Sequence, residues 1–159
     1  PDTAKWQVLH QMDCCQMVYE QPVDSFTTAG SELIMPLDEN HIPQMLELTA
    51  LTKPGPFLQN TIRFGNYFGI FENGRLAAMS GQRMHAEPYL EVSAVCTHPD
   101  FRGRGYAKAL MLQVMKLILA QNRIPFLHVL TANTGAIRLY ESIGFRTRTR
   151  IGIDVLKRL

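Results

Sequence analysis

The sequence predicts an α+β fold in which helices pack on a mixed, mostly antiparallel central sheet. Apolar strand-like segments alternate with amphipathic helical segments, and an Asn-Gly pair at 73–74 joins two of the strand segments as a hairpin. In the C-terminal half a strand, a helix and another strand follow one another, the order of a parallel crossover. The expected order is β-α-α-β-β-β-α-β-α-β, with about four helices flanking the sheet.

The first 30 residues are the hardest part of the chain to assign. Apolar clusters at 6–9 and 12–19 are followed by Pro22 and a Thr-Thr-Ala-Gly-Ser segment, so we predict an N-terminal arm or accessory segment over residues 1–30. Residues 31–159 then form one domain of ordinary size.

The domain is expected to begin with a strand over residues 32–35, after which Asp38 caps a helix. Pro43 suits the first turn of that helix, where no amide donor is needed. The apolar positions of the helix are Ile42, Met45, Leu46 and Leu48. Pro-Gly-Pro at 54–56 predicts a loop that is a natural lid or substrate wall, and a short helix is expected over 57–64.

Three strands follow in the middle of the chain. The first two, over 67–72 and 75–83, are joined by Asn73 and Gly74, which supply the positive φ angles of a type I′ turn. The third strand covers 89–97.

The C-terminal part is predicted to contain two helices and two strands. A long helix over 105–121 is followed by a strand over 126–130, and Asn133 or Thr134 then caps the second helix. Gly144 ends that helix in the left-handed conformation. A strand or hairpin over 145–156 completes the fold.

Composition excludes several classes of protein. The 159 residues include 16 Lys plus Arg, 14 Asp plus Glu and 46% hydrophobic residues, which fits a globular domain and not a disordered or collagen-like chain. The net charge of +2 argues against a nucleic-acid-binding protein. Three cysteines, two of them adjacent, suggest reduced thiols and a cytoplasmic location. No apolar run approaches the about 18 residues that span a bilayer, and no secretion signal stands at the N-terminus.

The segment from Val95 to Ala107 could bind an anion. It places two glycines and two arginines between a strand and the long helix, so the helix amides and Arg102 or Arg104 could hold a pyrophosphate. A dinucleotide fingerprint fails, because Lys108 stands where Gly or Ala is needed. The alternative is an ordinary strand-to-helix turn with solvated arginines.

Two motifs resemble those of the GCN5-related N-acetyltransferase (GNAT) family. Arg102-x-x-Gly105-x-Ala107 matches the Q/R-x-x-G-x-G/A signature, and the segment from Asn133 to Phe145 is similar to N-x-x-A-x-x-L-Y-x-x-x-G-F. The resemblance covers residues 32–156 and is nearest to the FR47-like, glycine N-acyltransferase-like group. It implies a GNAT-type fold and an acyl-CoA-dependent N-acyltransferase that uses acetyl-CoA and no metal. The acyl group would pass to a primary amine by direct attack in a ternary complex.

The resemblance also implies where coenzyme A binds. The pyrophosphate would lie on the turn 102–108, the pantetheine arm would pair with 95–97, and Asn133 would contact the cofactor. Backbone amides around Val95 and Cys96 could hold the thioester oxygen. The expected cofactor-binding residues are Val95, Cys96, Thr97, Arg102, Gly103, Arg104, Gly105, Tyr106, Ala107, Lys108 and Asn133.

Tyr140 resembles the family's general acid, since a phenol with a pKa of about 10 can protonate a departing thiolate. By spacing alone it could equally be a core aromatic. The base is open between Glu91, His128 and a chain of waters. Glu91 is unusual as a carboxylate in an apolar strand, although it could instead pair with an arginine. His128 stands five residues before Asn133, where some relatives that acetylate protein N-termini carry a glutamate.

Other patterns are discounted. Cys96 and His98 would lie about 7 Å apart on one strand face, too far for a nucleophile pair. The five histidines show no metal-ligand spacing. Arg146, Arg148 and Arg150 are expected to form a solvated basic face.

Several alternatives stay open. The fold could serve as a non-catalytic coenzyme A-binding regulatory or protein-interaction module, and a nucleic-acid module is disfavoured by the charge. No nucleic-acid or membrane partner is expected. A small-molecule or peptide amine as acceptor, the acyl chain preference and a homodimer are not resolved by the sequence.

Overall fold

The structure is a computed structural model that describes residues 2–21 and 33–159. Those residues contain seven strands, three α-helices and three short 3-10 turns. They divide into two compact units, Gln21–Phe126 and the pair of segments Pro1–Glu20 and Leu127–Leu159. Pro22 and the polar segment after it lie outside the described residues.

The unit Gln21–Phe126 is built on an antiparallel sheet with one parallel addition. The strands β2 (Ile34–Leu37), β3 (Tyr67–Glu72), β4 (Arg75–Ala86) and β5 (Tyr89–Thr97) pair antiparallel in that order. β6 (Ile124–Leu130) joins parallel to β5, and the pairs run from Tyr89 with Ile124 to Glu91 with Phe126. The mixed, mostly antiparallel sheet and the parallel crossover are therefore confirmed.

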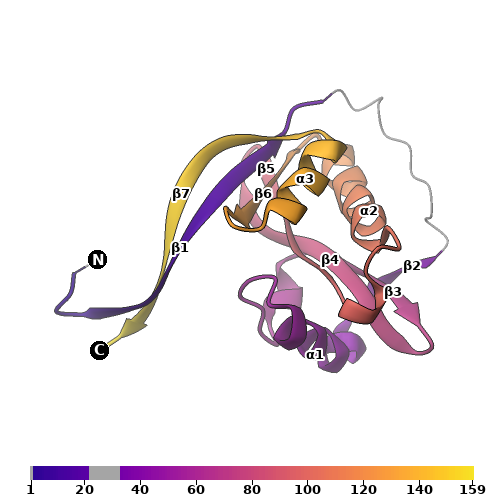
Figure 1. Ribbon diagram of the computed structural model, residues 1–159, viewed down its shortest axis with the longest axis horizontal. Coiled ribbons are helices and arrows are strands. Elements are labelled where there is room, and N and C mark those ends of the chain that lie inside the picture. The colour runs from indigo at the N-terminus through magenta and orange to yellow at the C-terminus, as the bar shows by residue number, and fades with distance from the viewer. Residues whose placement is uncertain (1, 22–32) are drawn as a thin grey trace. The chain divides into compact units, whose positions relative to one another are not determined.

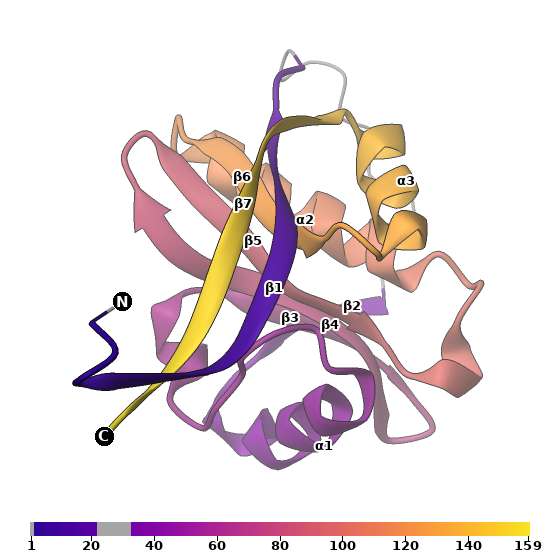
Figure 2. The same cartoon turned by 60° about the vertical axis from the view of Figure 1, so that its left-hand side comes forward.

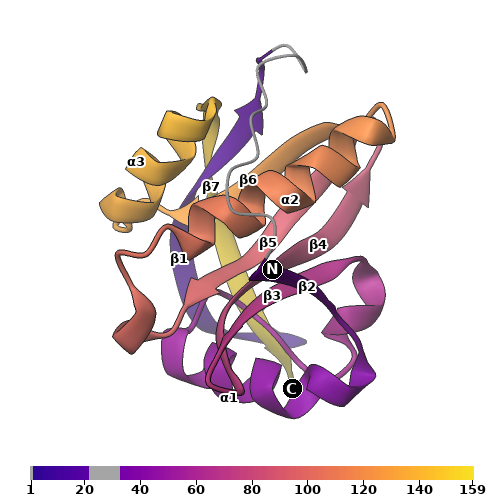
Figure 3. The ribbon, with the colours of Figure 1, turned by 90° about the vertical axis from the view of Figure 1, so that its right-hand side faces the viewer.

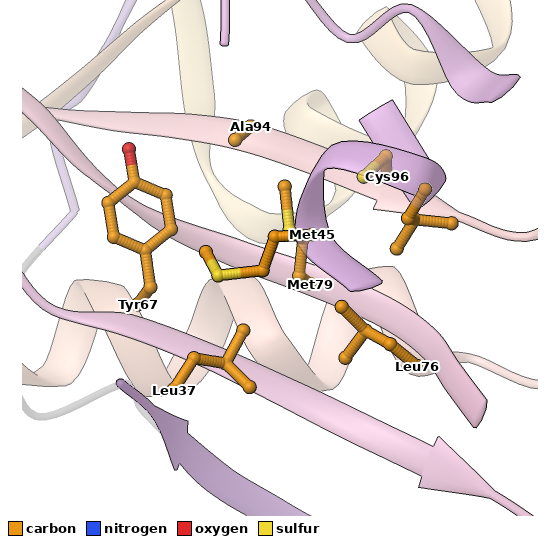
Figure 4. Packing of buried hydrophobic residues seen from close by; sticks show 8 residues of the cluster. Leu37, Met45, Tyr67, Leu76, Met79, Ala94 and Cys96 are labelled. Atoms are coloured by element: carbon orange, nitrogen blue, oxygen red, sulfur yellow. The ribbon is translucent and has the colours of Figure 1, made fainter. Parts of the chain in front are cut away.

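Two helices cover opposite faces of this sheet. α1 (Ile42–Thr52) contributes Met45 to a buried cluster with Tyr67 and Met79, which Figure 4 shows from close by. α2 (Tyr106–Ala120) lies across the strands in Figure 3 and contributes Leu110 to a second cluster with Ile70 and Ala78. Because successive strand residues face opposite sides, the two clusters lie on different faces.

Local turn chemistry is largely as predicted. Asn73 and Gly74 have φ angles of 51° and 78°, so the Asn-Gly hairpin is confirmed. Asp38 caps a 3-10 turn, Glu39–His41, and α1 begins directly after it. The short helix expected over 57–64 is only a 3-10 turn, Thr61–Phe64. The described residues thus contain three α-helices where about four were expected, because so short a segment forms too few hydrogen bonds to offset the cost of helix nucleation.

The other unit contains a long two-stranded ribbon and one helix. β1 (Trp6–Tyr19) pairs antiparallel with β7 (Phe145–Arg158) along its length, and the two strands run side by side in Figures 1 and 2. α3 (Thr134–Ile143) is capped by Asn133 and ends at Gly144, whose φ is 108°, as predicted. Most of the expected N-terminal arm is therefore a strand, and β7 is one strand and not a hairpin.

None of the described helices combines the length and the apolar composition that crossing a membrane requires.

Candidate functional site

The turn between β5 and α2 has the backbone shape that the sequence predicts. Gly103 and Gly105 both have φ of 78°, and Gly105 is the N-terminal cap of α2. That left-handed angle is strained for other residues. The first amides of an α-helix have no carbonyl partner within the helix, so the turn presents donors suited to an anion.

The cations on this turn are not equivalent. Arg104 donates to the carboxylate of Glu72 at 3.3 Å and stacks over the ring of Phe101 at 5.1 Å. Tyr106 donates its hydroxyl proton to the same Glu72 oxygen. The hydrogen bond with Tyr106 and the charge of Glu72 raise the pKa of the Arg104 guanidinium. Across residues 2–21 and 33–159, the side chain of Arg102 has no such partner.

The tip of the β3–β4 hairpin therefore braces the turn, which the sequence did not suggest. Glu72 precedes the Asn-Gly pair, and Arg75 follows it with a 3.8 Å ion pair to Asp100. Gln44 of α1 also binds the hairpin tip, because its side-chain oxygen accepts from the Leu76 amide at 2.8 Å. Only the tertiary fold brings residues 72 and 104 together, so no local pattern signals this contact.

β5 contains a bulge beside the expected thioester site. Met79 pairs with Cys96 and Gly81 pairs with Ser93, so two residues of β5 oppose the single residue Ser80. Ala94, one of these two, has a φ of 53°. A bulge turns backbone groups out of the regular hydrogen-bonded ladder. Here the bulge affects the backbone near Val95 and Cys96, whose amides are the expected oxyanion donors. Alanine has no preference for positive φ, so the sequence carries no signal for this bulge.

Cys96 is not an activated nucleophile. Its thiol is buried, and burial raises its pKa to about 11 although a hydrogen bond with Thr52 works in the opposite direction. The nearby His98 uses its Nδ1 to accept from the Asp100 amide at 3.2 Å. The geometry agrees with discounting a Cys-His pair.

Glu91 makes the arginine pair that the sequence left open. Its side chain is 1% exposed, and both its oxygens accept from Arg83, each at 2.8 Å. The Met84 amide donates to one of them at 3.3 Å. The hydrogen bond to Glu91 is also the main reason that the pKa of Arg83 is raised.

The remaining expected residues belong to the other unit. Tyr140 is a buried residue of α3 whose ring meets Phe145 edge-on, with centroids 6.3 Å apart. Asn133 accepts from the Ala136 amide at 3.2 Å as the cap of the same helix. His128 on β6 is half-buried and lies 3.1 Å from the amide nitrogen of Gln16 on β1.

The candidate residues are thus divided between the two units. The unit Gln21–Phe126 holds the glycine turn, the bulge and Glu91, and the other unit holds Asn133, Tyr140 and His128. Within the described residues, no group of three or more His, Cys, Asp or Glu side chains is arranged to hold a metal ion.

Comparison with known proteins gives consistent matches. The family model described as FR47-like protein matches residues 67–151, more than half of the chain. A GNAT-family protein from Novosphingobium aromaticivorans has 39% sequence identity and a TM-score of 0.88, over 97% of this chain and 68% of that one. The ribosomal-protein-S18-alanine N-acetyltransferase of Escherichia coli has 19% identity and a TM-score of 0.64, over 77% of this chain and 92% of that one, and shows the fold alone.

Two curated relatives are mycothiol acetyltransferases. The protein from Thermobispora bispora is 36% identical over 92 residues, which cover 54% of this chain. The protein from Thermomonospora curvata is 35% identical over 93 residues, or 55% of this chain. In each case the match spans only 30% of the relative's own length.

Proposed function

The chain belongs to the GCN5-related N-acetyltransferase family, in its FR47-like group, and from this membership we propose that it is an acyl-CoA-dependent N-acyltransferase. Acetyl-CoA is the proposed donor and a primary amine the acceptor. The observation that carries the proposal is the turn Arg102–Gly105, where two left-handed glycines lead into the open amides of α2. We place the protein in the cytoplasm, since Cys14, Cys15 and Cys96 are free thiols.

The residues of this turn fit a pyrophosphate. The negative charges of a pyrophosphate need donors and cations that are not already bound to other groups. Arg102 and Lys108 meet this need, because both are exposed and neither has a side-chain hydrogen-bonding partner among the described residues. Arg104 is held by Glu72, so we assign it to shaping the turn. The pantetheine arm would pair with 95–97, and Asn133 would contact the cofactor from its cap position.

Acyl transfer needs a stabilised oxyanion and a proton for the leaving sulfur. Bound acetyl-CoA supplies an activated thioester. Amides at the bulge near Val95 and Cys96 would hold the carbonyl oxygen, a contribution of about 3 kcal/mol for each well-placed donor. Tyr140 would donate its phenolic proton to the departing sulfur, and the phenolate would then recover a proton from solvent.

Water is the proton acceptor that we propose for the amine. Glu91 and His128 are the two side-chain candidates. Both carboxylate oxygens of Glu91 accept from Arg83, and Nε2 of His128 lies 3.1 Å from Nε2 of Gln16. Glu91 is further committed to neutralising Arg83. A neutral fraction of the amine, maintained by solvent, can attack without a dedicated side-chain base.

The proposal is tested by incubating the protein with acetyl-CoA and a panel of primary amines that includes amino acids, peptide N-termini, lysine peptides and aromatic amines. We expect free thiol release and a matching acetylated product in the mass spectrum. Coenzyme A binding without transfer to any amine would favour the non-catalytic module, and absence of binding would contradict both readings. Sedimentation of the same sample distinguishes a monomer from the homodimer left open above.

A further inference from the structure

Three polar side chains form a continuous chain of hydrogen bonds in the unit that carries Tyr140. Arg148 of β7 donates to Oε1 of Gln16 at 2.7 Å. Nε2 of Gln16 lies 3.1 Å from Nε2 of His128 on β6. The glutamine thus connects an exposed arginine to a half-buried histidine that the sequence marks as a candidate base.

A bulge in β7 brings Arg148 to this position. Gln16 pairs with Thr149 and the next residue, Met17, pairs with Thr147, so Arg148 is the extra residue of the ladder. A bulge commonly re-aims the side chain of its extra residue. Arg146, Arg148 and Arg150 are all exposed, as expected for solvated arginines, but the strict alternation of β7 is broken at Arg148, which donates to Gln16.

The chemistry of the three groups fixes every donor and acceptor. A guanidinium has only donors, so the oxygen of the Gln16 amide must face Arg148. The amide NH₂ then faces His128, and because this group cannot accept, Nε2 of His128 must be the acceptor. A neutral imidazole carries one proton, which must therefore lie on Nδ1. The opposite amide orientation would place the Gln16 NH₂ against the guanidinium of Arg148, so that two donors would face each other.

We propose that Gln16, oriented by Arg148, is a positioning residue that fixes His128 as the neutral Nδ1–H tautomer. The single lone pair of the neutral ring then lies in the hydrogen bond from Gln16. To take a proton at Nε2, His128 must lose this bond, because its new N–H would face the Gln16 NH₂. Rotation of the amide cannot relieve that contact without turning the NH₂ toward Arg148. The consequence for catalysis rests on the proposed acyltransfer: His128 is not the base that removes the amine proton.

The tautomer is measured directly by long-range ¹H–¹⁵N correlation spectra of protein with ¹⁵N-labelled histidine at neutral pH. We expect a pyridine-type Nε2 and a protonated Nδ1 for His128. Gln16→Glu keeps the contact with Arg148 but offers His128 only acceptors, so Nε2 should become the protonated nitrogen. A wild-type spectrum with a protonated Nε2, or an unchanged tautomer in Gln16→Glu, would overturn the proposal.

Two further variants separate this role from general strand packing. Arg148→Met removes the group that orients the amide, and we expect a mixture of tautomers. Gln11→Leu removes another glutamine bond across the same strands, 3.2 Å to Asp154, and should leave the His128 signals unchanged. If Gln11→Leu shifts them as Arg148→Met does, the effect comes from loosening the ribbon and the proposal fails.

The catalytic consequence is tested with His128→Asn, which keeps an N–H donor near the Nδ1 position and cannot take up a proton. We expect kcat to fall by less than about tenfold, whereas removing a general base typically costs about 10²- to 10⁴-fold. A loss in that larger range would overturn the assignment. A wild-type protein without any transfer activity would instead contradict the proposed function, while the spectra still decide the tautomer.

Discussion

At the scale of single residues, identical side chains in the same turn have different environments. Arg102 and Arg104 are two positions apart and equally good phosphate ligands by type. Glu72 and Phe101 contact Arg104, whereas Arg102 is exposed and has no such partner among the described residues. The sequence motif could identify the turn but not this difference in contacts, which depends on a hairpin some 30 residues earlier in the chain.

Arg102→Ala should therefore weaken coenzyme A binding more than Arg104→Ala does. Loss of a charge-assisted contact to phosphate predicts an increase in Kd of about tenfold. Arg104→Ala should act mainly on the stability of the turn. Isothermal titration with coenzyme A measures both, with Arg63→Ala in Thr61–Phe64 as a control for general loss of charge. Equal effects of Arg102→Ala and Arg104→Ala would contradict the assignment.

Tyr140→Phe isolates the phenolic hydroxyl. Phenylalanine keeps the ring that packs edge-on against Phe145, so the free energy of unfolding should change little. If the hydroxyl is the general acid, kcat should fall by about 10²-fold or more while the Kd for acetyl-CoA stays the same. Steady-state kinetics and titration separate the two quantities. Turnover at the wild-type rate would make Tyr140 a core residue only.

At the scale of elements, the predictable parts are those with local causes. The Asn73-Gly74 turn and the Gly144 cap follow from residues that favour positive φ, and both are present. The bulge at Ala94 has no such residue. The pairing of β1 with β7 joins segments more than 100 residues apart, for example Tyr19 with Phe145, and no periodic pattern specifies a partner at that distance.

The role of glycine in the turn between β5 and α2, the proposed pyrophosphate site, can be tested by a substitution that causes no steric clash. A Cβ on Gly103 would meet no atom within 4 Å, so Gly103→Ala reports only the left-handed backbone angle. We expect a loss of stability of about 1 kcal/mol and weaker coenzyme A binding.

The matched control is Gly74→Ala. Gly74 has the same φ of 78° and equally open surroundings, but it lies in the β3–β4 turn. Gly74→Ala should lower the free energy of unfolding, measured by urea denaturation, by a similar amount and leave the affinity for coenzyme A unchanged. Equal losses of affinity in both variants would remove the turn at Gly103 from the binding site.

The Arg83–Glu91 pair links β4 to β5 and should behave as a structural bond. Glu91→Gln leaves the guanidinium without its counter-charge in a largely buried place, so unfolding free energy should fall by about 3 kcal/mol. Urea denaturation measures this loss, and the double variant Arg83→Met, Glu91→Met should recover part of it. A Glu91→Gln protein that is fully stable but inactive would instead support Glu91 as the base.

At the scale of the whole molecule, ligand binding should be visible as stability. If coenzyme A binds only the folded chain, a concentration of about 100 times its Kd raises the free energy of unfolding by about 2.7 kcal/mol. A thermal melt with acetyl-CoA should show a higher Tm, and Arg102→Ala should reduce the increase at the same ligand concentration. An unchanged Tm at millimolar acetyl-CoA would contradict the proposed donor.

The ribbon of β1 and β7 limits where the boundaries of an expressed fragment of this protein can be placed. A fragment chosen to match residues 67–151 would discard Trp6–Tyr19 and sever the neighbouring strand before its last seven residues, 152–158. What is left of Phe145–Arg158 would carry unsatisfied amides and carbonyls along the side where its partner had been, a surface on which other chains readily add. Boundaries drawn from family likeness alone would therefore yield an aggregating protein, and the N-terminal strand belongs in every expressed version.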